Sequence, residues 1–402
     1  MEKKKALNNI DLWDLDNMCC GCTACFNVCP TKAITMTSNE RGFYVPSVNV
    51  LKCISCGLCK KVCQIENIPQ RNKPSDKYGI VNHNNDLRMK SSSGGLFSAI
   101  LMKMFEQYPN RFHCFGVKFD DDLTAIHSCA DSLSECADFR GSKYVQSDLN
   151  NVFTHIGQLL RQGDTVMFTG TGCQCAGLKN YIVTKHIDDS NLFVVDIVCH
   201  GAPSNGLWKD YIKAIEDTTG QKILSYKFRN KEDGWRGLHP LAILANGDMV
   251  ERNKLFLSYG RFFGRLSLNV PCYSCKYANT KRIGDLTMGD YWGIEKSDCS
   301  FDDGKGVSLC LVNTQKGKLI FDGIRESIES YEIKDTSYLQ PQLCAPTSRN
   351  ILSKDFWKDY KNKGYMYVVK KYTGHSRGYS AVMKIFTKIK TICFIRWAPP
   401  KI

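Results

Sequence analysis

Long apolar runs are missing from this 402-residue sequence, and none approaches the roughly 18 residues that a membrane-spanning helix needs. Residues Met1–Trp13 are polar, carry a run of lysines and lack the apolar stretch of a secretory signal peptide. These absences favour a cytoplasmic protein, and disulfide bonds do not persist in that compartment. We therefore expect its 21 cysteines to serve metal or redox chemistry.

Acidic residues are missing after Asp359, where ten Lys or Arg residues follow. This segment holds most of the formal net charge of +14, so the rest of the chain is only weakly basic. A 4Fe-4S core with its four thiolates carries a net charge of about −2. Cluster binding therefore brings the body of the protein close to neutrality, which excludes a general nucleic-acid-binding function.

Eight N-terminal cysteines repeat one spacing, C-x2-C-x2-C-x3-C, and the second run begins 34 residues after the first. In two-cluster ferredoxins with this spacing, the fourth cysteine of each run binds the other cluster. The pattern therefore predicts two 4Fe-4S clusters. Their ligand sets are Cys19, Cys22, Cys25 and Cys63 for one, and Cys53, Cys56, Cys59 and Cys29 for the other.

Zinc is the alternative for paired cysteines, but a structural zinc site needs only four ligands, usually as two pairs. Two complete four-cysteine runs favour iron–sulfur clusters. Two residues depart from the expected pattern: Gln64 replaces a second proline, and Cys20 is an additional thiol. We expect neither residue to bind iron.

The domain organisation follows from composition. Polar residues 70–77, which include a proline, predict a linker between a ferredoxin domain, 1–69, and a larger domain, 78–345. Apolar β-rich segments alternate with helical patterns in the larger domain, which predicts an α/β fold with a mixed sheet. The expected fold class is an α+β ferredoxin-like module, a larger α/β domain, and a basic helical tail over 346–402.

Two loops of the larger domain have the composition of phosphate-binding sites. Ser91–Gly95 and Thr169–Gly172 each place backbone N–H groups and hydroxyls before a predicted helix. Neither loop matches a Walker motif or GxGxxG, and a tight turn with a helix cap is the alternative. Together they predict a nucleotide cofactor, to which Lys143 in the loop Gly141–Tyr144 adds a positive charge.

Further cysteines recur near these loops. A third 4Fe-4S cluster is predicted with the ligands Cys173, Cys199, Cys272 and Cys275, and Asp290 is an alternative ligand. The competing interpretation is a CxxC turn beside two buried thiols. We expect the scattered cysteines to be buried thiols without a ligand role; these are Cys114, Cys129, Cys136, Cys299, Cys310, Cys344 and Cys393.

Five strings in the same order resemble the family of coenzyme F-420 hydrogenase/dehydrogenase beta subunits, in the form that carries an N-terminal 2×(4Fe-4S) ferredoxin domain. They are residues 91–97, 140–146, 170–174, 195–204 and 284–293. The resemblance implies a flavin-binding larger domain, in which FAD lies beside an iron–sulfur cluster. It also implies an oxidoreductase that exchanges hydride with a deazaflavin or another organic partner.

The resemblance further implies roles for particular residues. The candidates for holding the FAD phosphates are Ser92, Ser93, Gly94, Gly95, Lys143, Thr171 and Gly172. His200 is a candidate acid/base group, and a histidine that only hydrogen-bonds its own loop is the alternative.

The expected partners are a one-electron carrier protein of ferredoxin or flavodoxin type, or a partner subunit, and a small-molecule hydride donor or acceptor. A non-catalytic electron-transfer subunit is the competing function. In the tail, Tyr379–Trp397 predicts an amphipathic basic helix. We expect such a helix either to lie on an anionic membrane surface or to pack against the body of the protein or an acidic partner.

Overall fold

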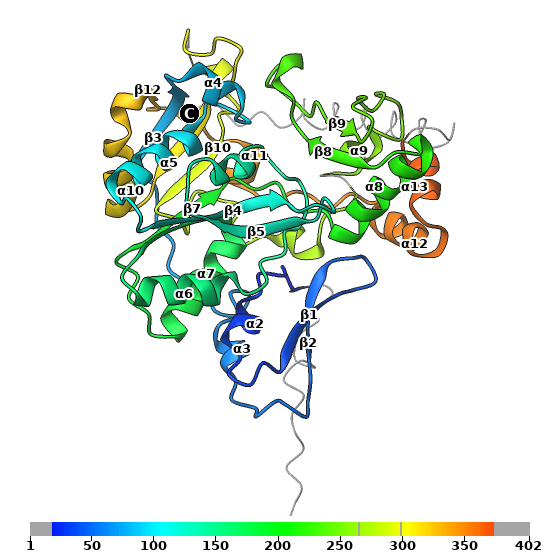
Figure 1. The fold of residues 1–402 in the computed structure, drawn as a ribbon, viewed down its shortest axis with the longest axis horizontal. Helices are drawn as coiled ribbons and strands as arrows, with labels where there is room; N and C mark the ends of the chain where they lie inside the picture. The colour runs from blue at the N-terminus through cyan, green and yellow to red at the C-terminus, as the bar shows by residue number, and fades with distance from the viewer. Residues whose placement is uncertain (1–17, 264–265, 298–299, 374–402) are drawn as a thin grey trace, which may run out of the picture.

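The computed structural model describes residues 18–263, 266–297 and 300–373, so the predicted amphipathic segment Tyr379–Trp397 lies outside it. A small N-terminal module lies below a large sheet, and a third group of helices and strands lies beside that sheet (Figure 1). Within the described ranges, no helix combines the length and apolar character needed to cross a membrane.

The N-terminal module consists of two short helices and a hairpin. α2 (Ala24–Val28) and α3 (Leu58–Lys61) each follow a cysteine-rich turn, and the antiparallel strands β1 (Ile34–Ser38) and β2 (Tyr44–Val48) lie between them in sequence. The sequence predicts a hairpin here, because Ala33–Met36 and Phe43–Val45 flank the turn residues Asn39–Gly42, and the pairing of β1 with β2 confirms it. Gly57 turns the chain before α3 with φ of +75°, a conformation that glycine adopts at little cost.

The large sheet has the strand order β12-β3-β11-β10-β7-β6-β4-β5. Its centre, β10-β7-β6-β4, is parallel, and antiparallel pairs extend it on both sides. The predicted mixed sheet is therefore confirmed. The strands are β3 (Asp76–Asn82), β4 (Phe112–Phe119), β5 (Ala125–Ala130), β6 (Thr165–Thr171), β7 (Leu192–Ile197), β10 (Leu286–Asp290), β11 (Ser308–Val312) and β12 (Ile328–Glu332).

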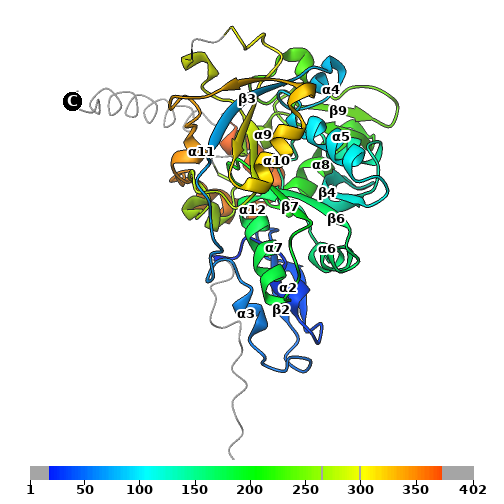
Figure 2. The same ribbon diagram turned by 90° about the vertical axis from the view of Figure 1, so that its left-hand side faces the viewer.

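Helices cover both faces of this sheet (Figure 2). Alternation along β6 sends Val166 and Phe168 into the core beneath α6 and α7, whereas Met167 joins the core beneath α5 and α10. The N-terminal module shares the first of these cores, because Val28 and Val62 are fully buried in it. The helices are α4 (Asn85–Met89), α5 (Leu96–Gln107), α6 (Val152–Arg161), α7 (Gly172–Thr184) and α10 (Gln315–Gly323).

An aromatic core holds the third group of elements. Trp208 and Tyr211 of α8 are fully buried there. Part of the predicted tail belongs to this core, because Phe356 of α12 and Tyr365 of α13 are buried in it. The elements are α8 (Asn205–Thr219), α9 (Ser258–Phe262), α12 (Ser353–Lys363), α13 (Tyr365–Tyr372), β8 (Ile223–Lys227) and β9 (Leu241–Leu244). The short helix α11 (Pro341–Cys344) instead buries Leu343 in a separate core with Tyr291 and Leu309.

Candidate iron–sulfur and cofactor sites

The predicted ferredoxin cysteines line two separate cavities. One, of about 180 Å³, is lined by Cys19, Cys22, Cys25 and Cys63, with Cys20 beside them. The other, of about 30 Å³, is lined by Cys29, Cys53, Cys56 and Cys59. The fold thus brings the fourth cysteine of each run to the cavity of the other run, which is the crossed arrangement that the spacing predicts.

The first cavity is unfavourable for uncompensated negative charge. Burial raises the pKa of the Cys19 thiol to about 12, and the neighbouring Cys63 raises it further. Burial also raises the pKa of Cys25, with further contributions from Cys19, Cys63 and Cys59. Four thiolates at this position therefore need a cationic core between them, which the iron ions of a cluster supply.

Backbone N–H groups donate to several cysteine sulfurs. Cys19 Sγ accepts from Gly21 at 3.3 Å, and Cys53 Sγ accepts from Ser55 at 3.4 Å. Such bonds stabilise thiolate charge and are one determinant of cluster potential. Gly21 has φ of +71°, and a Cβ added to it would lie 2.3 Å from Nε2 of Gln146, so this turn requires glycine.

The structure also brings together the four cysteines of the predicted third set. Cys173 is the second residue of α7, Cys199 follows β7, and Cys272 and Cys275 lie at a 3₁₀ turn, Val270–Ser274. Burial raises the pKa of Cys272, and the charges of Cys199, Cys173 and Cys275 each raise it further. All four thiols therefore lie within electrostatic reach of one another.

The two departures from the ferredoxin pattern meet between the first cavity and the third set. Cys20 Sγ accepts a hydrogen bond from Gln64 Nε2 at 2.9 Å, and the Cys20 thiol also contacts that of Cys173. The hydroxyl of Tyr277 donates to Gln64 Oε1 at 2.5 Å. Cys20 and Gln64 therefore connect the module to the larger domain, a role that their sequence positions do not reveal.

A cavity of about 330 Å³ lies in the larger domain, within the size range of small-molecule sites. The predicted residues Ser92 and Lys143 line it, and Ser92 Oγ lies 3.1 Å from Ser142 Oγ. Of its basic residues the sequence predicts only Lys143; Lys227 ends β8, and Arg229 and Lys231 follow it. The basic residues in the lining are Lys90, Arg140, Lys143, Lys227, Arg229 and Lys231.

Two of these lysines are only partly protonated at pH 7 without an anion. Burial lowers the pKa of Lys143 to about 7, and its Nζ donates to the carbonyls of Asp138 and Arg140 at 2.6 and 2.9 Å. Burial also lowers the pKa of Lys231 to about 7, with Arg88 and Arg229 contributing. An anionic ligand would restore the charge of both lysines.

Asp290, the alternative cluster ligand, is instead bound to a cavity residue. Arg229 Nη1 donates to Asp290 Oδ2 at 2.5 Å, and the two side chains are only 4% and 15% exposed. Burial raises the pKa of Asp290, whereas the positive charge of Arg229 lowers it. The carboxylate thus balances an arginine at the edge of the cavity.

Other predicted phosphate-binding residues do not line this cavity. Ser93 Oγ lies 2.8 Å from Ser308 Oγ, and a Cβ at Gly94 would lie 1.9 Å from the carbonyl oxygen of Ile80. Gly95 precedes α5 with φ of +86°. The close approach of this loop to the sheet therefore accounts for both glycines.

The second predicted loop lies beside the third cysteine set. Thr171 Oγ1 is 3.2 Å from Cys173 Sγ, and a Cβ at Gly172 would lie 2.7 Å from Cβ of Tyr277. His200 also lies in this region, where its Nδ1 is 2.9 Å from Nε2 of Gln342. These three residues are therefore placed near the cysteines and not in the lining of the cavity.

The scattered cysteines differ in how deeply their side chains are buried. Cys114, Cys136 and Cys310 are buried, as predicted. Cys344 is exposed, so the prediction for it is wrong; it ends the short helix α11, which buries Leu343 instead. Cys129 is partly buried, and Cys299 and Cys393 lie outside the described residues.

Two known families match the chain, one in the N-terminal module and one in the larger domain. Residues 163–336 match the family described as coenzyme F420 hydrogenase/dehydrogenase, C terminus of the beta subunit. Residues 18–67 match the 4Fe-4S dicluster domain. The dicluster match spans all eight cysteines of the two repeated runs and supports iron–sulfur clusters in the N-terminal module.

Two curated proteins and one solved structure are similar to parts of the chain. A polyferredoxin-like protein of Methanocaldococcus jannaschii is 37% identical over 59 residues, which is 13% of this chain and 35% of that protein. A component of the F(420)H(2) dehydrogenase of Methanosarcina mazei, its F subunit, is 19% identical over 331 residues, covering 79% of this chain and 85% of that protein. A chain of the F420-reducing [NiFe] hydrogenase complex from Methanosarcina barkeri aligns with a TM-score of 0.44 and 15% identity, over 65% of this chain and 84% of that chain.

Proposed function

Because the chain belongs to the family of coenzyme F420 hydrogenase/dehydrogenase beta subunits and carries a 4Fe-4S dicluster domain, we propose that it is an iron–sulfur flavoprotein oxidoreductase. In this proposal it passes electrons between 4Fe-4S clusters and FAD and exchanges hydride with an organic substrate or a deazaflavin-like coenzyme. The observation that carries the proposal is the cation-lined cavity, which lies in the same domain as the third set of cysteines.

The donors in the cavity suit a flavin dinucleotide. Ser92 and Ser142 offer hydroxyls, and Lys143 and Lys231 offer cations to phosphate groups. Phe228 offers an aromatic face. A bound flavin supplies the exchange between two-electron hydride chemistry and one-electron cluster chemistry.

Aromatic side chains connect the cavity to the third cysteine set. Tyr144, next to Lys143, lies 4.8 Å from Phe263 between ring centroids, and Phe263 lies 5.2 Å from His200. His200 directly follows Cys199. In the proposal, the third cluster is therefore the one nearest the flavin, and His200 holds or moves a proton near that end of the cavity.

The ferredoxin clusters link this centre to an external one-electron carrier or to a partner subunit in the cytoplasm. A non-catalytic subunit is the alternative function, and one observation favours it: the Methanosarcina mazei relative is itself a subunit of a dehydrogenase. In that case a partner protein holds the substrate site.

Steady-state dye reduction by the anaerobically purified chain separates the two functions. We expect a viologen to be reduced when the chain is supplied with a reduced deazaflavin or a nicotinamide as hydride donor. The enzyme function is supported if the wild-type chain turns over and Lys143→Gln turns over more slowly while its iron content is unchanged. No turnover with any donor, but electron passage once a partner subunit is added, supports the alternative.

A further inference from the structure

Three apolar side chains are exposed beside the second cysteine cavity. Leu51 is 93% exposed, Ile54 63% and Val50 60%. Ile54 also lines the cavity of Cys53 and Cys56. Large apolar side chains that gather at one exposed site on a soluble protein commonly mark an interaction surface.

The charged residues of this segment have one sign. Lys52 is exposed in the same turn, and Lys60 and Lys61 lie on α3. In the part of the chain that the structure describes, these lysines have no ion-pair partner. The sequence has no Asp or Glu between residues 41 and 65, so no acidic residue of this segment offsets them.

The second cavity is also the more accessible of the two. Cys56 is exposed, whereas Cys22 and Cys25 of the first cavity are buried. Cys59 of the second cavity and Cys25 of the first lie within electrostatic reach of each other, so the two predicted cluster sites are neighbours. The apolar and basic residues therefore lie beside the more accessible of the two predicted cluster sites.

We propose that Val50, Leu51 and Ile54, with Lys52, Lys60 and Lys61, dock an acidic one-electron carrier protein over the second cluster. This rests on the proposed function, since it requires iron–sulfur clusters in the module. In the docked complex the reduced carrier loses one electron, the oxidised cluster gains it, and no bond forms or breaks. Negative charge on the carrier complements the lysines, and its apolar centre covers Leu51.

The test uses the anaerobically purified holoprotein and a photoreduced acidic 2[4Fe-4S] ferredoxin in a stopped-flow instrument. We expect a second-order rate constant that falls with ionic strength, as steered association does. Lys52→Glu with Lys61→Glu should lower that constant at least about tenfold at low salt and flatten its salt dependence. Leu51→Ser should weaken the complex with little change in salt dependence.

Two controls keep the result interpretable. Lys370→Glu on α13 makes the same kind of charge change at another exposed lysine and should leave the rate unchanged. Reduction by titanium(III) citrate needs no docking and should be equal in all variants. Equal ferredoxin rates in wild type and Lys52→Glu/Lys61→Glu overturn the docking surface. If titanium(III) citrate does not reduce the wild-type protein, the presence of the clusters is contradicted, and so is the proposed function.

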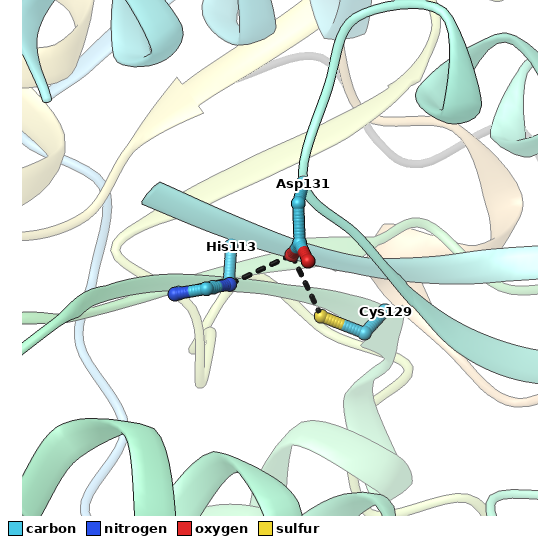
Figure 3. A group of neighbouring side chains, drawn as sticks. All are labelled: His113, Cys129 and Asp131. Atoms are coloured by element: carbon cyan, nitrogen blue, oxygen red, sulfur yellow. Dashed lines mark hydrogen bonds and ion pairs between the residues drawn. The ribbon is translucent and has the colours of Figure 1, made fainter. Parts of the chain in front are cut away.

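An independent observation concerns the edge of the large sheet, far in sequence from these residues. His113 of β4, Cys129 of β5 and Asp131 offer three metal-ligand atoms within 4.8 Å of one another (Figure 3). His113 Nδ1 is 2.7 Å from Asp131 Oδ1, and Cys129 Sγ is 3.4 Å from the same oxygen. The β4–β5 register pairs Cys114 with Ala130, which places His113 opposite Asp131.

A supporting carboxylate lies on the other side of the imidazole. His113 Nε2 is 3.7 Å from Asp164 Oδ2, and Asp164 Oδ1 accepts from Arg111 Nε at 3.1 Å. Metal-binding histidines commonly direct their second nitrogen to a carboxylate. Thiolate, imidazole and carboxylate together are ligands that Zn²⁺ accepts, and a water completes four-coordination at an open position.

The geometry points to a Zn²⁺ site at His113, Cys129 and Asp131. Zinc per chain, measured by mass spectrometry after equilibrium dialysis of the holoprotein against Zn²⁺, should be one equivalent higher in wild type than in Cys129→Ser or His113→Gln. Cys344→Ser, at an exposed cysteine, should keep that equivalent, and iron per chain should be equal in all four proteins. Equal zinc in wild type and Cys129→Ser overturns the site.

Discussion

Nε2 of Gln64 lies 2.9 Å from Sγ of Cys20, and Oε1 of the same amide accepts a hydrogen bond from the Tyr277 hydroxyl at 2.5 Å. One side chain therefore joins the N-terminal module to the segment that follows Cys275. Because Cys20 also contacts Cys173, the junction lies directly between the first cavity and the third cysteine set.

Gln64→Leu should weaken this junction. The substitution removes both hydrogen bonds and leaves buried polar atoms without these partners, which costs about 1–3 kcal/mol. Anaerobic urea unfolding, followed by circular dichroism, measures the loss. Gln107→Leu, at an exposed position on α5, is the matched control. Equal unfolding midpoints for Gln64→Leu and wild type would contradict a structural role for the amide.

Cys272→Ala should remove the third cluster alone. If the third set binds 4Fe-4S, wild type holds about twelve irons per chain and the variant about eight. Iron and acid-labile sulfide analysis of anaerobically purified protein gives the count. Cys310→Ala, at a fully buried thiol in the large sheet, serves as the control and should keep all the iron. Eight irons in wild type would show that the third set binds no cluster.

FAD affinity should depend on pH through the cavity lysines. The pKa values of Lys143 and Lys231 are lowered to about 7, so both lysines lose their charge as the pH rises through 7. A bound phosphate favours the protonated lysine, so the FAD dissociation constant should rise above pH 7, by up to about tenfold per pH unit for each coupled proton. Flavin fluorescence titrations of deflavinated protein between pH 6 and 9 measure it. Lys143→Gln should reduce the slope, and an unchanged slope would contradict this role.

Arg229→Gln should destabilise the protein more than the double variant Arg229→Gln/Asp290→Asn does. Removing the arginine leaves Asp290 buried without its counter-ion, which costs about 3–5 kcal/mol. Asp290→Asn added to Arg229→Gln removes the stranded charge and should restore part of that loss. Thermal unfolding under argon compares the three proteins. A double variant as unstable as the single one would show that the ion pair is not the cause.

Much of the fold follows from local patterns. Apolar periodicity in the sequence predicts a helix over Leu96–Gln107 and a strand over Thr165–Thr169. The helix coincides with α5, and the strand lies within β6. The sequence also predicts a hairpin in the larger domain, with Leu238–Leu244 and Met249–Arg252 on either side of a turn at Asn246–Asp248. This hairpin is only partly formed, because Leu241–Leu244 pairs with β8 and Met249 makes a single bridge to Ile243. The antiparallel partner of β9 is β8, and local sequence alone does not determine which strand a given strand pairs with.

Some residues of the candidate sites can likewise be predicted from local sequence, and others cannot. The ferredoxin cysteines are predictable because their spacing alone defines the crossed arrangement. The cavity lysines are not, because Lys227 and Lys231 reach the Ser92 loop only through the tertiary fold. Gly94 and Gly172 lie in loops whose composition is typical of phosphate-binding loops. Their close packing against Ile80 and Tyr277, which leaves no room for a Cβ, explains why glycine stands at both positions.

The central claim is that one chain holds both clusters and flavin. Anaerobic purification followed by iron, sulfide and acid-extracted flavin analysis, with EPR of the reduced protein, tests it most directly. The proposed function predicts one FAD and about eight to twelve irons per chain, with 4Fe-4S signals. Iron without flavin, even after incubation with excess FAD at pH 6.5, would contradict it.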